Sequence, residues 1–264
     1  MAAPTALAPD TPAHTVDAFH RGRFWLVQPR HGHRAGMDAM MLAAAVPSGF
    51  AGRFADFGAG AGAAALAVLS RCPDARAVLV ERSPEMADFA AATVAHPGNA
   101  HLGARASVLT ADVTLSGRAR SDAGLADNGF DFVIMNPPFN AAEDRATPDI
   151  LRKQAHVAED GLFERWIRSA AAVVRPRGGL AVIARPEQLV AILDAIDGRF
   201  GDTEMLCVHA RPDAAAIRIV VRATLGARGK LSIRPPLTLH GPSGNKPTDR
   251  TEMISNGLAS LFGD

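Results

Sequence analysis

The tetrapeptide Asn136-Pro137-Pro138-Phe139 combines hydrogen-bond acceptors with an aromatic ring. Two successive prolines fix the local backbone and remove two N–H donors. The Asn136 side-chain oxygen and the Pro137 carbonyl oxygen remain as acceptors, which is what an –NH2 group requires. Phe139 adds a face on which a planar base can stack, a contact worth about 1–3 kcal/mol per base in proteins that bind single-stranded nucleic acids. The motif therefore favours chemistry on an amino group attached to a planar group.

Three alternate glycines form a second motif, in a segment that runs from Asp56 through Gly58 and Gly60 to Gly62. The segment is expected between a strand and a helix, where the backbone must approach a ligand closely and only glycine permits it. Gly58, Gly60 and Ala63 also match the dinucleotide pattern G-x-G-x-x-A, whereas no Gly-Lys-Ser/Thr follows as in a P-loop. The Asp56 carboxylate would repel a pyrophosphate at close range. The motif therefore favours a cationic ligand, such as a sulfonium that carries an amino acid.

Two further acids follow the next two expected strands. Glu81 ends one strand, at roughly the 20-residue offset at which an acid reaches ribose hydroxyls. Such an acid fits the ribose of a nicotinamide cofactor or of S-adenosylmethionine. Asp112 follows the other strand, where its carboxylate could meet an adenine amine or serve only as a turn residue.

Alternating strands and helices must position these motifs. The expected helices are 37–46, 61–71, 84–94, 162–174 and 186–196, with 118–128 as a polar loop. The expected strands are 54–57, 77–81, 106–110, 130–135, 179–184, 205–209 and 217–223, after a short run at 24–28. This order predicts an α/β fold with a mostly parallel, seven-stranded sheet flanked by helices, a C-terminal antiparallel pair and a short N-terminal hairpin extension. Because ligands bind outside the carboxyl ends of parallel strands, the glycine turn and Asn136 should lie on one edge.

The composition excludes several classes of protein. The 264 residues are 48% hydrophobic and 21% charged with a formal net charge of +1, which is ordinary for a globular chain. No run approaches the roughly 18 apolar residues of a membrane span, and Cys72 and Cys207 make no disulfide framework. The N-terminus lacks a secretory signal, so we expect a cytoplasmic protein. The expected parts are a disordered leader 1–15, an N-terminal extension 16–50 that packs on the ligand site, a core 51–225 and a C-terminal extension 226–264.

The motifs together resemble a known superfamily. The glycine turn, Glu81, Asp112 and the Asn136 tetrapeptide occur in the order seen in Rossmann-like, class I S-adenosylmethionine-dependent methyltransferases, in which the tetrapeptide marks members that methylate planar amino or amide nitrogens. The chain resembles in particular the bacterial tRNA1(Val) adenine-37 N6-methyltransferase family, of the small-methyltransferase type, over about residues 16–255. Further similar stretches are 34–42, 152–156 and 235–240. Phe139 departs from the family, which often carries Tyr there, so a hydroxyl contact is lost while stacking is kept.

The resemblance implies a role for each motif. The cofactor S-adenosylmethionine would lie over the three glycines, with Asp38 and Asp56 near its amino-acid end, Glu81 at its ribose and Asp112 at its adenine. Asn136 would contact the cofactor and would also act in catalysis. Its side-chain oxygen and the Pro137 carbonyl would accept the amino hydrogens of a flipped-out tRNA adenine. Orientation and electrostatics would supply most of the catalysis. No metal is expected, since His31 and His33 have no third ligand nearby in the sequence.

Basic residues around the tetrapeptide are candidates for RNA contacts. The loop 140–152 is long for a strand-to-helix connection, which usually has about 2–6 residues, and this length predicts a lid or substrate loop. The candidates at the substrate mouth are His33, Arg34, Arg145, Arg152, Lys153 and His156. A second basic set predicts either a surface that tracks phosphates or a solvated tail, and consists of Arg222, Arg228, Lys230, Arg234, Lys246 and Arg250.

The sequence leaves other functions open. The same tetrapeptide occurs in relatives that methylate guanine N2 of ribosomal RNA or a glutamine amide of release factors. An NAD-dependent oxidoreductase is disfavoured by Asp56, by the prolyl tetrapeptide and by the lack of a Tyr-x-x-x-Lys pair. A cofactor-binding module without catalysis is disfavoured by the intact tetrapeptide. The residues do not indicate an oligomeric state.

Overall fold

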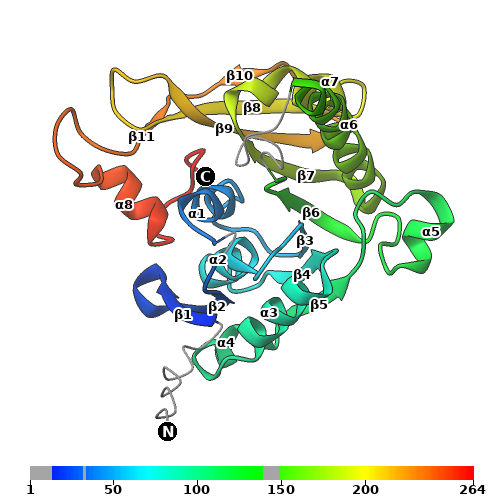
Figure 1. The fold of residues 1–264 in the computed structure, drawn as a ribbon, viewed down its shortest axis with the longest axis horizontal. Coiled ribbons are helices and arrows are strands. Elements are labelled where there is room, and N and C mark those ends of the chain that lie inside the picture. Colours follow the sequence, from blue (N-terminus) through cyan, green and yellow to red (C-terminus); the bar gives the residue numbers. More distant parts are fainter. Residues whose placement is uncertain (1–13, 32–33, 139–148) are drawn as a thin grey trace, which may run out of the picture.

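The computed structural model describes residues 14–31, 34–138 and 149–264, with the backbone alone over 149–160. A nine-stranded sheet forms the centre, and a separate two-stranded antiparallel hairpin precedes it (Figure 1). The hairpin consists of β1 (His14–Phe19) and β2 (Phe24–Pro29). The sheet contains β3 (Arg53–Phe57), β4 (Arg76–Glu81), β5 (Ala106–Thr110), β6 (Phe130–Met135), β7 (Val174–Ala184), β8 (Phe200–His209), β9 (Ala216–Leu225), β10 (Ser232–Ile233) and β11 (Leu237–Thr238).

The sheet order is β10-β8-β9-β7-β6-β3-β4-β5, with β11 also paired to β8. The neighbouring strands β5, β4, β3, β6 and β7 are mutually parallel, whereas β9 is antiparallel to both β7 and β8. The chain moves outward from β3 to β5 and then returns, so that β6 pairs with the other side of β3. Loops that leave β3 and β6 therefore diverge at this reversal, which is where open α/β sheets bind ligands.

Alternating residues of the central strands face two separate apolar cores. Phe54, Leu79 and Ile134 contribute to one core, and their neighbours Phe57 and Val133 contribute to the other. This period of two is the geometry of a strand whose two faces are both covered. The first core includes α1 (Met37–Ala44), α2 (Ala63–Arg71), α3 (Pro84–Ala95) and α4 (Ala100–Gly103), and the second includes α6 (Asp149–Val173) and α7 (Leu189–Ile196).

The two ends of the described chain meet on one side of the sheet (Figure 1). Helix α8 (Asp249–Ser255) contacts α1, and its Glu252 pairs with Arg21 of the hairpin turn. The hairpin is itself tied to the turn after α3, because the Asn99 side chain accepts from the Trp25 N–H and donates to its carbonyl. The N-terminal and C-terminal segments thus pack around α1.

The structure confirms the predicted fold class and corrects several element boundaries. The sheet gains two short edge strands, β10 and β11, because the segment after Leu225 runs back along β8. The expected polar loop 118–128 begins with a helix, α5 (Gly117–Asp122), which buries the Arg120 side chain against the Leu125 carbonyl. Helix α6 begins at Asp149, inside the loop predicted to extend to residue 152. Strand β1 begins at His14, inside the expected leader.

The remaining helical turns are short, and are η1 (His20–Gly22), η2 (Pro97–Asn99) and η3 (Pro186–Gln188). At the start of α3, the Ser83 hydroxyl accepts from the Met86 N–H and Pro84 occupies the first helical position, as the sequence predicts. None of the described helices is long and apolar enough to cross a membrane.

Candidate active site

A cavity of about 380 Å³ opens at the carboxyl edge of the sheet, beside the point where the strand order reverses. Three widely separated parts of the sequence contribute to its wall: the start of α1, the glycine turn after β3 and the residue that follows β6. The antiparallel strand β9 adds a fourth part. The polar and glycine residues that line the cavity include Asp38, Asp56, Gly58, Gly60, Asn136 and Arg218.

The glycines of the turn lack side chains for different physical reasons. All three have positive φ, with values of 69° at Gly58, 54° at Gly60 and 94° at Gly62, a region in which side chains are strained. A Cβ on Gly58 would lie 2.6 Å from the Trp166 ring of α6, and one on Gly62 would lie 2.6 Å from the Leu79 side chain. A Cβ on Gly60 would meet only the Met86 methyl, at 3.8 Å. Packing therefore explains Gly58 and Gly62, whereas Gly60 faces open space that a ligand can occupy.

Asp56 is a buried carboxylate at the floor of the cavity, with 2% of its surface exposed. Its Oδ2 accepts from the Ala65 N–H at 3.0 Å and so caps the first turn of α2, which has no side-chain cap of its own. Burial raises the pKa of Asp56 to about 7, the Ala65 bond opposes this rise, and the nearby Glu81 charge adds to it. Because burial makes the charged carboxylate unfavourable, a positively charged ligand beside it would be favoured.

Glu81, at the end of β4, braces the glycine turn. Its Oε2 accepts from the Gly60 N–H at 2.9 Å and its Oε1 accepts from the Ser83 N–H at 2.8 Å. Each carboxylate oxygen has a second lone pair, so both oxygens can still accept from hydroxyl groups. The residue thus shapes the turn and stays a proposed ribose ligand, although it is not among the residues that line the cavity.

Asp112 follows β5 and makes the turn contact that the sequence left as one alternative. Its Oδ1 accepts from both the N–H and the hydroxyl of Thr114, at 2.8 and 2.7 Å. Burial acts to raise the pKa of Asp112, but these bonds and the charges of Arg82 and Arg165 outweigh it and hold the pKa below its usual value. Because Oδ1 makes both turn bonds, a contact of Oδ2 with an adenine amine stays compatible with them.

Asn136 lies directly after β6 and lines the cavity. Its Oδ1 is buried and accepts no hydrogen bond from any described residue. Buried acceptors are normally paired, because an unpaired one costs about 1–3 kcal/mol. The next residue, Pro137, is buried and brings no N–H that could satisfy this oxygen. Pro138 is exposed, and Phe139 lies outside the described residues. The arrangement is a vacant acceptor that an –NH2 group would satisfy.

Helix α1 places Asp38 in the cavity wall and is fastened to β9 by two arginines. Near the start of α1, Arg218 Nε donates to Asp38 Oδ2 at 2.9 Å. At the other end, Arg222 Nη1 donates to the Ala45 carbonyl at 3.3 Å. Residues four apart in a strand lie on one face about 13 Å apart, which matches the roughly 12 Å length of an eight-residue helix. Strand β9 therefore holds both ends of α1.

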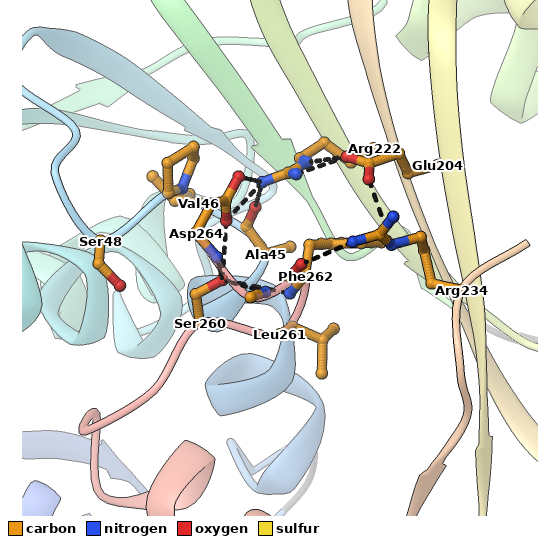
Figure 2. Close-up of polar contacts among 12 residues, drawn as sticks. Ala45, Val46, Ser48, Glu204, Arg222, Arg234, Ser260, Leu261, Phe262 and Asp264 are labelled. Carbon is orange, nitrogen blue, oxygen red and sulfur yellow. Dashed lines mark hydrogen bonds and ion pairs between the residues drawn. The ribbon is translucent and has the colours of Figure 1, made fainter. Parts of the chain in front are cut away.

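A polar cluster at the C-terminus completes this fastening (Figure 2). Arg222 lies between two acids, with Nε 3.0 Å from Glu204 Oε2 and Nη1 2.7 Å from Asp264 Oδ2. Its guanidinium also covers the Phe262 ring, 4.5 Å from the centroid. The last residues bind the end of α1 directly, because the Leu261 N–H donates to the Ala44 carbonyl at 2.6 Å.

This cluster corrects the interpretation of the second basic set. Arg222 is only 13% exposed in its side chain and binds internal partners, so its prediction as a phosphate contact is wrong. Arg234 donates to the Phe262 carbonyl and Arg250 to the Leu261 carbonyl, so both also hold the C-terminal segment. These three arginines stabilise the fold, whereas the sequence left open a phosphate-binding surface or a solvated tail.

The first basic set is only partly described. Arg34 lines the cavity, and its guanidinium donates to Asp17, Thr15 and the Pro29 carbonyl of the hairpin. Three other candidates, Arg152, Lys153 and His156, belong to the first part of α6. Only the backbone of this part is described. His33 and Arg145 lie outside the described residues. RNA contact stays a prediction for all of them.

Two polar residues of the cavity wall were not singled out from the sequence. Gln28 of β2 accepts from the Ala35 N–H and donates to Asp17, which fixes the approach to α1. Arg218 contributes the only guanidinium that binds a cavity acid among the described contacts. The available signal was a pair of arginines four residues apart, 218 and 222, on one face of an otherwise largely apolar strand.

The residues present fit S-adenosylmethionine, the cofactor that the resemblance implies. Gly60 leaves open space above the turn. Asp56 carries a carboxylate whose raised pKa a positive ligand would lower. Glu81 and Asp112 supply acceptors at the two neighbouring strand ends. When bound, this cofactor supplies an electrophilic methyl group on a sulfonium.

Comparisons with known proteins place the chain in a family. The family model of the methyltransferase small domain matches residues 34–211. The tRNA1(Val) (adenine(37)-N6)-methyltransferase of Porphyromonas gingivalis is 29% identical over 178 residues, which cover 66% of this chain and 67% of that protein. The release factor glutamine methyltransferase of Caulobacter vibrioides is 29% identical over 172 residues, which cover 62% of this chain and 55% of that protein.

A solved structure is more similar. The predicted O-methyltransferase Atu636 from Agrobacterium tumefaciens has 42% sequence identity and a TM-score of 0.75, and the match covers 85% of this chain and 98% of that one. The fold, the cavity and the family match together identify the kind of enzyme. The chain belongs to the methyltransferase small domain family and is an S-adenosylmethionine-dependent methyltransferase.

Proposed function

We propose that this enzyme methylates the exocyclic N6 of an adenine in tRNA, at position 37 of an anticodon loop, in the cytoplasm. The observation that carries the proposal is that Asn136 lines the cavity while its buried Oδ1 has no hydrogen-bond partner among the described residues. An adenine amino group offers two N–H donors on a planar ring, so one of them would satisfy this oxygen.

The tetrapeptide would act by orientation. The Asn136 side-chain oxygen and the Pro137 carbonyl would accept the two amino hydrogens and concentrate electron density on N6, whose lone pair otherwise delocalises into the ring. Holding the amine against the methyl donor supplies most of the rate, because fixed geometry replaces a bimolecular encounter. Fixed acceptors also stabilise the positive charge that develops on nitrogen during transfer.

Two considerations favour tRNA as the acceptor. A relative with 29% identity is named as an adenine-37 N6-methyltransferase of tRNA1(Val). A base in a single-stranded loop can also leave its stack at low cost, which is why sequence-specific enzymes often act there. A second relative with 29% identity is named as a release factor glutamine methyltransferase, so the group that receives the methyl must be tested directly.

The first experiment is transfer of labelled methyl groups to isolated acceptors. Purified enzyme is incubated with tritiated S-adenosylmethionine and, in separate reactions, with bulk tRNA, ribosomal RNA or release factor from cells that lack this gene, and label in RNA is assigned by nucleoside analysis. Label in N6-methyladenosine supports the proposal, and cleavage mapping should place it at position 37. Label only in ribosomal N2-methylguanosine, or only in a release factor, would replace the proposal with the corresponding activity.

A variant tests the role of Asn136. Asn136→Ala should reduce transfer by a factor of about 100 or more, the scale seen when one oriented polar group is removed from a reacting centre. Its affinity for S-adenosylmethionine, measured by calorimetry, should change little. Asn245→Ala is the matched control, because this asparagine accepts from Arg211 and does not line the cavity. Equal losses of cofactor affinity and transfer would contradict the role assigned to Asn136.

A further inference from the structure

The ion pair between Arg218 and Asp38 joins residues 180 positions apart at the cavity wall. Arg218 Nε lies 2.9 Å from Asp38 Oδ2, and the two side chains are 24% and 27% exposed. Arg218 Nη1 also donates to the Ile217 carbonyl at 2.7 Å, which fixes the plane of the guanidinium. The cavity therefore presents an oriented cation and an oriented anion side by side.

Stability alone is a weak reason for such a pair. A partly buried ion pair loses about as much hydration energy as it regains in attraction. The other end of α1 is already held by Arg222, by the Leu261 N–H and by the C-terminal cluster. The polar residues at the start of α1 are therefore better explained by a ligand that needs both charges.

The cofactor has one part that needs both charges. Its amino-acid end is a zwitterion, with an ammonium group and a carboxylate on the same carbon. The hydroxyl groups of its ribose and the amino group of its adenine can donate to the acceptors Glu81 and Asp112 at the ends of β4 and β5. Those strands lie on the far side of β3 from β9, as the sheet order requires.

We propose that Arg218 binds the α-carboxylate of S-adenosylmethionine, while Asp38 and Asp56 face its positive charges. A guanidinium carries five N–H donors in a planar fork, enough to hold Asp38 and a second carboxylate at once. Arg218 is then a cofactor-binding residue contributed by the antiparallel part of the sheet. The proposal depends on the cofactor and not on the identity of the methyl acceptor.

Arg34 is the other cation of the cavity wall, and its contacts give it a different role. Its guanidinium already donates to Asp17 at 2.9 Å, to Thr15 at 3.0 Å and to the Pro29 carbonyl at 3.2 Å. These partners all belong to the β1–β2 hairpin, so Arg34 ties the hairpin to the entrance of α1. Arg218, in contrast, binds an acid of the cavity itself.

Calorimetry with three ligands tests the proposal without any turnover. S-Adenosylhomocysteine carries both charges of the amino acid, decarboxylated S-adenosylmethionine lacks only the carboxylate, and 5′-methylthioadenosine lacks the whole amino acid. Arg218→Gln should lower the affinity for S-adenosylhomocysteine roughly 10- to 100-fold, the usual effect of losing a hydrogen bond to a charged group. The decarboxylated ligand should bind as well as before or better, because Asp38 loses its internal partner. Binding of 5′-methylthioadenosine should not change.

Three controls separate this role from a structural one. Arg211→Ala removes an arginine of the same sheet edge that binds the Gly241 carbonyl and does not line the cavity, and it should leave all three affinities unchanged. Asp38→Asn should weaken both ligands that carry the ammonium group. Arg218→Lys keeps the charge and should give a smaller loss with the same ligand dependence, even where Arg218→Gln folds poorly. An equal loss for all three ligands, or no loss for any, would overturn the proposal.

Discussion

Replacing Asp56 by Asn should stabilise the cofactor-free enzyme above neutral pH, although the residue lines the cofactor cavity. Burial raises the pKa of Asp56 from its ordinary value of 3.8 to about 7. The folded chain therefore holds the proton more tightly than the unfolded chain does. The charged Asp56 therefore destabilises the fold: this loss of stability is absent below about pH 4, grows as the pH rises, and reaches its full size above pH 7. That pKa difference corresponds to a loss of folding free energy on the order of 4 kcal/mol.

Asn removes the charge and keeps an oxygen that can accept from the Ala65 N–H, as Oδ2 does now. The assay is urea unfolding of the cofactor-free protein and of Asp56→Asn, from pH 4.5 to pH 8.5. The difference in unfolding free energy should be small at pH 4.5 and should grow toward pH 8. The melting temperature should rise by about 2–4 °C for each kcal/mol gained in a chain of this size. The same variant should bind S-adenosylmethionine more weakly, because a cationic ligand loses its partner.

Asp112→Asn is the matched control, because the folded-state pKa of Asp112 is lowered and not raised. Its carboxylate stabilises the fold above its ordinary pKa, and this contribution is lost as the pH falls. Asp112→Asn should therefore bring no gain at pH 8. A gain from Asp56→Asn that is the same at pH 4.5 and pH 8, or a loss at both, would refute the argument from burial.

Three further predictions concern the turn, the C-terminal cluster and the hairpin. Gly58→Ala should destabilise the fold by about 1–3 kcal/mol through its contact with Trp166, whereas Gly60→Ala, with a positive φ but open space, should destabilise the fold less and also weaken cofactor binding; thermal melts and calorimetry separate the two. Arg222→Met should lower the unfolding free energy by about 2 kcal/mol, because it leaves the partly buried Glu204 without its main partner; a change below about 1 kcal/mol in urea unfolding would show that the cluster is dispensable. His20 is buried and its pKa falls to about 4, through burial first and then the charges of Arg71 and Arg23, so its stabilising contribution is complete above about pH 6.5 and is lost as the pH falls toward 4; a His20→Phe variant should show a weaker loss of stability between pH 7 and pH 5 than the parent.

Much of the site could be predicted from the sequence because it depends on local rules. Strand and helix periods place the glycine turn and the Asn136 tetrapeptide at carboxyl ends of strands. The freedom of Gly60 to adopt the positive φ that the turn needs and the missing N–H of Pro137 follow from covalent structure alone. The acid at the end of β4 follows from its offset from the turn. These features need no knowledge of which strands become neighbours.

Only the tertiary structure decided which distant charges meet. Arg218 reaches Asp38 because β9 inserts beside β7 in antiparallel orientation, and nothing near either residue in the sequence encodes that pairing. The same insertion turns Arg222 inward, toward Glu204 and the C-terminus, although the sequence predicted an exposed cation in a phosphate-binding surface or a solvated tail. Burial likewise sets the pKa of Asp56. The energy of a charge depends on the partners and the dielectric around it, and both are products of the folded arrangement.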